Sequence, residues 1–536
     1  MTFIKIPTKS EFQKEFPNFK TVEQKEYLID GEIKTWNGAM QEVEGAISLK
    51  NDNECHRLVL GSYPLMDTEE ALKAADAACK AYDNGCGEWP TMSVKQRIKC
   101  LEKFTFAMKE KRDEVVNLLM LEIGKNAADS AKEFDRTIEY IADTIAALKD
   151  LDRVSSRFTI EKGIIGQIRR APLGVVLCMG PYNYPLNETF TTLIPALLMG
   201  NTVVFKPPKH GVLLHYPLLE AFKDAFPKGV INTVYGEGKE VASPLMASGK
   251  IDVLAFIGSS RVANILKQQH PKPSRLKCVL GLEAKNAGIV LDHADIKLAA
   301  KECLSGNLSY NGQRCTAIKI TFVARSVADE FIAEYLEQFK NLKSGMPWEK
   351  GVSLTPLPNE QSLEFLKELL NDALQKGAKI INENGGKIDG SYFHPAVLYP
   401  VTKDMRIFHE EQFGPIVPIA VFDDIKEPVN AVIESKFGQQ VSLFGTNPDK
   451  IAKLIDNLVN QVCRVNINSQ CQRGPDTFPF TGRKDSAEGT LSVTDALRVF
   501  SIRTLVAARN ESINQELLTQ ILKENKSAFL STDFIF

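Results

Sequence analysis

The alternation of apolar runs with helical segments between residues 174 and 280 constrains the fold more than any other feature. Helices of this length between buried strands predict parallel βαβ units in an open twisted sheet. The expected strands are 174–179, 202–206, 231–235, 253–257 and 276–280, and the expected helices are 186–199, 213–222, 239–247 and 261–267. Such sheets bind ligands at the carboxyl ends of their strands, so this region predicts a nucleotide-binding domain.

A second run of the same kind begins near residue 287. Strands are expected at 287–291, 317–323, 416–420 and 441–444, with helices at 296–308, 327–341 and 361–376. Residues 1–67 suggest an irregular arm with short strands, and amphipathic helices should begin at Thr68 and cover 93–123 and 127–148. We therefore expect an α/β fold with two open twisted parallel-sheet domains, and an active site between them.

Charge and cysteine usage exclude several classes of function. The 536 residues carry a net charge of −2, which gives no basic field for nucleic acid. The most apolar region, 175–205, is broken by Pro181, Pro185 and Pro195, so we expect no membrane helix. Ten cysteines without a CxxC pair and seven histidines without metal-ligand spacing predict no metal site. No signal peptide opens the chain, and a cytoplasmic enzyme is expected.

The segment from Tyr310 to Thr316 holds the best candidate for a nucleophile. Cys315 follows a glycine turn and precedes an expected strand, and the permanent charge of Arg314 should favour its thiolate. A single cysteine is more often an inert, buried residue, so the assignment needs partners. For anion binding, Gly258-Ser259 opens a helix after strand 253–257, whereas Gly236 belongs to a weaker two-glycine signal.

Six fragments in order strengthen the assignment. They are Pro181-Tyr182-Asn183-Tyr184-Pro185, Lys206-Pro207-Pro208, Phe256-Ile257-Gly258-Ser259, Gly312-Gln313-Arg314-Cys315, Glu411-Gln412-Phe413-Gly414-Pro415 and Pro479-Phe480-Thr481-Gly482. Over about residues 25–505 the chain resembles the aldehyde dehydrogenase superfamily. Within it, the sequence is most similar to the non-phosphorylating NADP-dependent glyceraldehyde-3-phosphate dehydrogenases.

The resemblance implies aldehyde oxidation through a cysteine thioester. It assigns the nucleophile to Cys315, and the oxyanion donors to the Asn183 amide and the Cys315 N–H. The family's general-base glutamate falls at Gly281 here, and Glu283 lies two residues later. Residues two apart on a strand share a side, so Glu283 could serve as the base or could be a structural ion-pair partner. Without a base, the thioester could pass to coenzyme A or phosphate.

The resemblance also assigns cofactor residues. Lys206 would bind the adenosine ribose, Ser259 the pyrophosphate and Glu411 the nicotinamide ribose, with Phe413 beside the ring. Many NAD-preferring relatives carry a glutamate three residues after the lysine, where this chain has Lys209. A cation there can pair with a 2′-phosphate, which favours NADP, with NAD as the alternative.

Three further residues fall at the substrate-phosphate positions of the phosphoglyceraldehyde subgroup: Tyr184, Arg314 and Arg473. Arg136, on an N-terminal helix, is a candidate for a third cation at the site. The guanidinium fork matches phosphate oxygens, so glyceraldehyde 3-phosphate is the expected substrate, although another short aldehyde with an anionic tail would also fit.

The domain assignment follows the same resemblance. Residues 1–152 and 171–282 should form the NAD(P)-binding domain and 283–483 the catalytic domain, with oligomerisation segments at 153–170 and 484–508. Exposed strands in these segments would need a second subunit, so a homodimer or homotetramer is expected. Residues 509–536 form a tail expected to contain a short helix and to dock on a subunit. The alternative from another class of function is a protein of the same fold that is not an enzyme and serves in binding or in a structural role.

Overall fold

The structure is a computed structural model that describes residues 4–51, 54–532 and 535. Its first large sheet has the strand order β10-β9-β8-β11-β12-β24. The bounds are β8 Val175–Met179, β9 Thr202–Lys206, β10 Ile231–Thr233, β11 Val253–Ile257, β12 Lys277–Gly281 and β24 Ala487–Glu488. The first five strands are parallel, whereas β24 pairs antiparallel with β12. The order reverses between β8 and β11, and that switch point opens a crevice at the carboxyl ends of the strands.

The helices between these strands are close to those predicted. They are α7 Asn187–Leu198, η2 Leu213–Leu218, α8 Leu219–Ala225, α9 Ala242–Ala247 and α10 Ser260–Gln269. Every residue of α7 is buried, including Thr189, Thr191 and Thr192. Their hydroxyls donate to main-chain carbonyls three or four residues earlier, so the polar side chains are satisfied inside the core.

The second large sheet has the order β15-β18-β19-β14-β13-β21-β22. The strands are β13 Ala287–Val290, β14 Ile320–Ala324, β15 Lys379–Ile380, β18 Ala396–Tyr399, β19 Ile416–Phe422, β21 Gln440–Phe444 and β22 Arg464–Ile467. The accompanying helices are α11 Ile296–Leu308, η4 Arg325–Val327, α12 Ala328–Phe339, α13 Glu360–Gln375, α14 Arg406–His409, α15 Lys426–Glu434 and α16 Pro448–Leu458. Only β15 runs antiparallel to its neighbour, so the expected fold class of two mostly parallel open sheets is confirmed.

The N-terminal region differs from the expected irregular arm. A long antiparallel pair, β4 Met40–Asn51 and β5 Glu54–Pro64, dominates it. Smaller elements accompany the pair: α1 Lys9–Glu15, β1 Val22–Glu23, β2 Glu26–Ile29 and β3 Glu32–Thr35. The backbone groups of β4 and β5 find their hydrogen-bond partners in each other. The sequence of this region is charged and alternates only weakly between apolar and polar residues, so it did not predict the long pair.

Five helices follow: α2 Thr68–Tyr82, α3 Glu88–Thr91, α4 Val94–Lys109, α5 Arg112–Ile123 and α6 Ala127–Ser155. Helix α2 begins at Thr68, as expected, and the Asp67 side chain caps it by accepting from the Glu70 N–H. The single helix expected over 93–123 is wrong, because a turn at Glu110 and Lys111 divides it. Apolar spacing continues across that turn, so periodicity alone could not mark the break.

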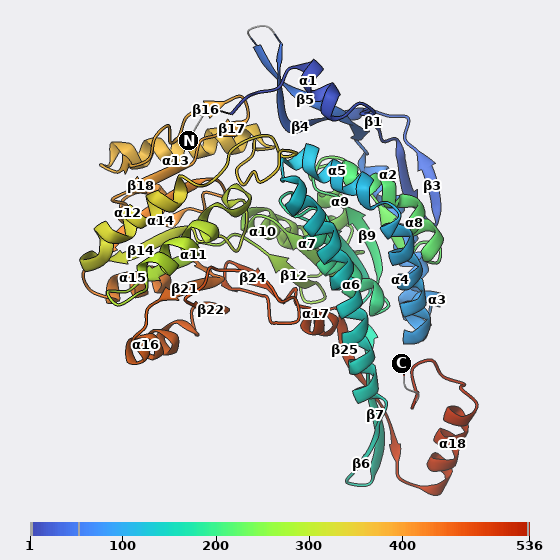
Figure 1. Ribbon diagram of the computed structural model, residues 1–536. Coiled ribbons are helices and arrows are strands. Elements are labelled where there is room, and N and C mark those ends of the chain that lie inside the picture. The colour runs from blue at the N-terminus through green and yellow to red at the C-terminus, as the bar shows by residue number, and fades with distance from the viewer. Residues whose placement is uncertain (1–3, 52–53, 533–534, 536) are drawn as a thin grey trace.

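A narrow arm extends away from the two sheets (Figure 1). It consists of β6 Phe158–Glu161, β7 Ile164–Pro172 and β25 Ser501–Arg509, with β7 in the centre. Strands were expected in the segment 484–508, but Val493 begins a helix, α17 Val493–Val499, that packs on α6 and α7. The segment expected to serve only oligomerisation, 484–508, also supplies β24 to the first sheet.

The C-terminal tail begins with the expected helix, α18 Ser512–Lys523, which has no buried residue. The chain then returns to the same subunit, where Leu530 is buried and the Gln167 side chain donates to the Ser531 carbonyl at 2.7 Å. Phe534 and Phe536, at the end of the tail that was expected to dock, lie outside the described residues. Among the helices that the structure describes, none is long and apolar enough to cross a membrane.

Candidate active site

One cavity of about 1000 Å³ joins the carboxyl ends of the strands of the first sheet to the segments that precede β14, β19 and β21 in the second sheet. Among the predicted catalytic and cofactor residues, its walls include Asn183, Lys206, Lys209, Gly258, Ser259, Glu283, Cys315, Glu411 and Phe413. Gly236 is not on these walls. It turns the chain at φ 119° beside Met66.

Cys315 lies in the turn after η3 Ser309–Gly312, where Tyr310, Asn311 and Gly312 all have positive φ. The Asn286 amide holds this turn by donating to the Cys315 carbonyl at 2.7 Å and to the Ala317 carbonyl at 3.0 Å. The expected strand therefore starts only at Ile320. In a strand, the carbonyls of Cys315 and Ala317 would accept hydrogen bonds from a neighbouring strand. Here they accept from the Asn286 side chain instead.

Burial, together with the negative charge of Glu188, raises the pKa of the Cys315 thiol to about 11. The expectation that Arg314 would favour a thiolate is therefore wrong. Its guanidinium donates to the carbonyls of Ser305 and Gly306, at 3.3 and 3.1 Å. In the resting structure, desolvation outweighs the neighbouring cation.

Asn183 is 6% exposed, and its amide Nδ2 donates to the Gln313 carbonyl at 2.8 Å, two residues before Cys315. The main-chain carbonyl of Asn183 accepts a hydrogen bond from Lys125 Nζ at 2.9 Å. Lys125 is fully buried against Glu133 and lies 3.5 Å from the Tyr184 ring centroid. These bonds hold the Asn183 amide beside the cysteine turn, as an oxyanion donor requires.

This chain has a glycine, and therefore no side chain, at the position of the family's general base. Gly281 ends β12 on the cavity wall, and a Cβ there would lie 3.2 Å from Leu491 Cδ1. Glu283 points to the N-terminus of α10, where its Oε2 accepts from the Ser260 N–H at 2.8 Å. That helix end is the predicted pyrophosphate position, so in this structure the Glu283 carboxylate takes the place of an external anion.

Lys206 fits a cofactor ribose. Desolvation lowers its pKa to about 8, and Nζ has only a long contact, 3.4 Å, with the Pro207 carbonyl. A buried ammonium with spare donors favours hydroxyl ligands. Ser259 caps α10 by accepting from the Val262 N–H at 3.3 Å, and exposed Lys209 lies on the same cavity wall.

Glu411 and Phe413 form the other side of the cavity. Burial raises the pKa of Glu411 to about 7, and Lys319 Nζ, 3.7 Å from its Oε1, opposes that rise. Lys319 Nζ also lies 4.6 Å from the Phe413 ring centroid. Phe413 has φ 40°, and this left-handed backbone places its ring against Tyr182, with centroids 5.8 Å apart.

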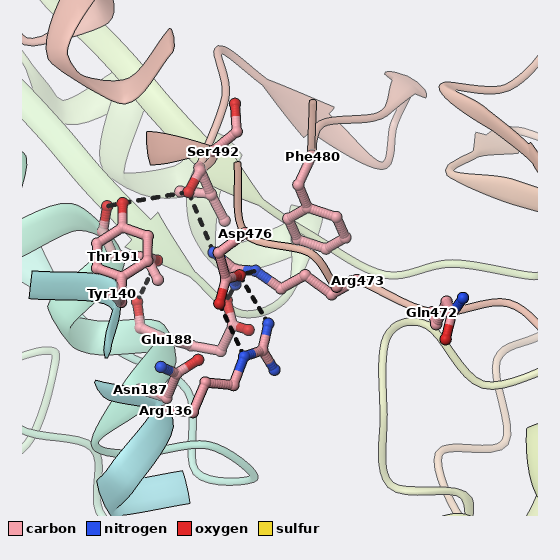
Figure 2. Close-up of polar contacts among 12 residues, drawn as sticks. Arg136, Tyr140, Asn187, Glu188, Thr191, Gln472, Arg473, Asp476, Phe480 and Ser492 are labelled. Atoms are coloured by element: carbon pink, nitrogen blue, oxygen red, sulfur yellow. Dashed lines mark hydrogen bonds and ion pairs between the residues drawn. The ribbon is translucent and has the colours of Figure 1, made fainter. Parts of the chain in front are cut away.

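The four predicted substrate residues lie behind the cavity rather than on its walls. Arg136 and Arg473 bind the same carboxylate, Asp476 (Figure 2). The ring of Tyr184 stacks over Lys125, and Arg314 faces the end of α11.

Two cavity residues were missed by sequence reasoning. Gln439 forms a hydrogen bond with Cys315 that lowers the thiol's pKa, and Glu188 lies on the wall near the same residue. No sequence signal marked Gln439. Glu188 was detectable as a charged residue in the first turn of an otherwise uncharged helix.

Comparison with known proteins agrees with this geometry. A model of the aldehyde dehydrogenase family matches residues 44–505. The chain belongs to the aldehyde dehydrogenase family. It is therefore an NAD(P)-dependent aldehyde oxidoreductase, and the non-catalytic alternative is set aside.

Two of the relatives that match this chain share a name. The chain is 31% identical over 493 residues to NADP-dependent glyceraldehyde-3-phosphate dehydrogenase of Pisum sativum, covering 89% of this chain and 96% of the relative. It is 34% identical over 442 residues to the protein of that name from Streptococcus equinus, covering 81% and 90%. A crystal structure of the Bacillus halodurans C-125 enzyme complexed with NADP matches with a TM-score of 0.83 and 32% identity, over 91% of this chain and 100% of the other.

Proposed function

We propose that this protein oxidises a short aldehyde with a polar tail to its carboxylic acid, with NADP as oxidant. The observation that carries the proposal is the single cavity that holds Cys315, Asn183, Lys206 and Glu411. The named relatives make glyceraldehyde 3-phosphate, oxidised to 3-phosphoglycerate, the reference substrate for testing.

Cys315 begins the reaction by adding its sulfur to the aldehyde carbon. The thiol first gives its proton to water, and the Asn183 amide and the Cys315 N–H then stabilise the oxyanion of the thiohemiacetal. A bound NADP would supply the acceptor for the hydride of this carbon. The remaining thioester releases the acid when water adds to it and the sulfur departs.

Lys206, Ser259 and Glu411 would hold the cofactor through its riboses and pyrophosphate. The Glu283 carboxylate would have to leave the N-terminus of α10 for the pyrophosphate to bind there. The carboxylate would then be available to activate water. Lys209 supports a preference for NADP, because an exposed ammonium on the cavity wall can pair with a 2′-phosphate.

A second outcome of the same chemistry is transfer of the acyl group to coenzyme A or phosphate. Gly281 favours it, because the chain offers no side chain at the usual position of the water-activating carboxylate. Both outcomes share the first half-reaction and differ only in the acceptor.

We further propose a homo-oligomer that forms through the arm of β6, β7 and β25. Ile160, Ile502 and Leu505 on this arm are 59%, 56% and 58% exposed, which favours cover by another subunit.

All ten cysteines are unpaired, which suits a cytoplasmic location.

NADPH absorbance tests the proposed function. Purified enzyme is mixed with NADP and glyceraldehyde 3-phosphate, without phosphate or coenzyme A, beside a Cys315→Ala control. Sustained turnover that the variant loses supports hydrolytic oxidation. A burst that stalls until an acceptor is added supports acyl transfer, and no signal with any short aldehyde would refute the proposal.

A further inference from the structure

Two arginines and two carboxylates form a closed charge network beside the cavity (Figure 2). Arg136 binds Asp476 through two hydrogen bonds, Nε to Oδ2 at 2.8 Å and Nη2 to Oδ1 at 2.7 Å. Arg473 Nε donates to the same Oδ1 at 3.0 Å, and Arg473 Nη1 is paired with Glu188 Oε2. The formal charges of these four residues sum to zero.

Arg473 has little remaining capacity for an external anion. Its side chain is 5% exposed, and Nη2 donates to the Leu491 carbonyl at 3.1 Å. Its guanidinium carbon lies 4.6 Å from the Phe480 ring centroid, so one face is covered. Its charge is satisfied within the protein.

Glu188 is the member of the network that reaches the cavity. It projects from α7 onto the wall that also carries Cys315, whereas Arg136, Arg473 and Asp476 do not line the cavity. Its Oε1 accepts no hydrogen bond from any residue that the structure describes, so it is available to a ligand donor. The surface presented near the nucleophile is therefore a carboxylate rather than a guanidinium.

A phosphate dianion and a hydroxyl would meet this surface differently. The dianion would have to replace Glu188 on Arg473 and leave a buried carboxylate unpaired beside it, which is costly. A hydroxyl could donate to Oε1 while the ion pair stays intact. Arg314 is no direct substitute, because it does not line the cavity and its Nη2 donates to the carbonyls of Ser305 and Gly306 in α11.

We propose that Glu188 determines substrate specificity, and that the site takes an uncharged hydroxyaldehyde whose hydroxyl donates to the Glu188 carboxylate. This inference rests on the proposed function, since it selects a substrate within the class of short polar aldehydes. Glu188 acts as an internal counter-ion that occupies Arg473 in place of a substrate phosphate.

The test compares two substrates that share the same reacting aldehyde, D-glyceraldehyde and D-glyceraldehyde 3-phosphate. For the wild type, kcat/KM should be higher for the unphosphorylated aldehyde. Glu188→Gln keeps the shape but removes the charge, and it should shift the ratio of the two kcat/KM values toward the phosphorylated aldehyde by at least about tenfold. Because both values come from one preparation, their ratio does not depend on the folded fraction.

A matched control is Glu139→Gln, which makes the same change on the exposed side of α6 and should leave the ratio unchanged. Inorganic phosphate gives a second readout. As a competitor of D-glyceraldehyde, it should inhibit Glu188→Gln at about tenfold lower concentration than the wild type.

The outcomes separate this inference from the proposed function. If neither aldehyde reduces NADP with the wild type, the proposed function fails first. If the wild type prefers the phosphorylated aldehyde, or if Glu188→Gln leaves the ratio unchanged, oxidation stands and the specificity role of Glu188 is overturned.

Discussion

Cys315 should react with an alkylating reagent at a rate that keeps rising with pH well above neutrality. The reason is the raised pKa of the Cys315 thiol, of which burial is the largest cause. The charges of Glu188 and Glu411 also raise this pKa, while Gln439 and Arg473 lower it. With a pKa of about 11, about one thiol in a thousand is ionised near pH 8, and about one in ten near pH 10. Since the thiolate is the reacting species, the rate should rise about a hundredfold over that interval.

The assay is iodoacetamide labelling of the cofactor-free protein, followed by mass spectrometry of the peptide that contains Cys315. Exposed Cys86 gives an internal reference for the reagent. Glu188→Gln removes the negative charge, so it should lower the pKa of Cys315 and raise its rate near pH 8. A rate that levels off below about pH 9 would contradict the reasoning, because it would show that a cation overcomes desolvation at the thiol.

Three further predictions test separate parts of the structure. Lys209→Glu should lower kcat/KM for NADP by at least about tenfold without lowering it for NAD, and equal losses with both cofactors would remove the 2′-phosphate role. Gly281→Glu places a carboxylate on the cavity wall at the cost of a tight contact with Leu491, and it should speed decay of the acyl-enzyme followed by mass spectrometry. An unchanged decay rate would show that position 281 does not limit hydrolysis. Trp89→Ala should lower the free energy of unfolding by about 3–5 kcal/mol in urea, because Trp89 is 1% exposed, whereas Phe106→Ala, at 70% exposed, should stay within about 0.5 kcal/mol.

Local pattern determined much of the fold. Strand β11 and helix α11 have the bounds predicted for them, since a short apolar run between turns and a capped amphipathic segment each carry their own signal. The order of the βαβ units then implied where a ligand binds. The family motifs placed Cys315 and Asn183, which the structure brings to one cavity.

The charges around the nucleophile were decided only by the tertiary structure. Arg473 and Glu188 lie 285 residues apart in the chain, and Arg136 and Asp476 lie 340 apart, so no local pattern links them. The sequence showed arginines suited to a phosphate, and the fold supplied their carboxylate partners. It likewise buried Cys315 deeply enough for desolvation to outweigh the positive charge of Arg473, since the free energy of an ionised group depends on every neighbour that replaces its water.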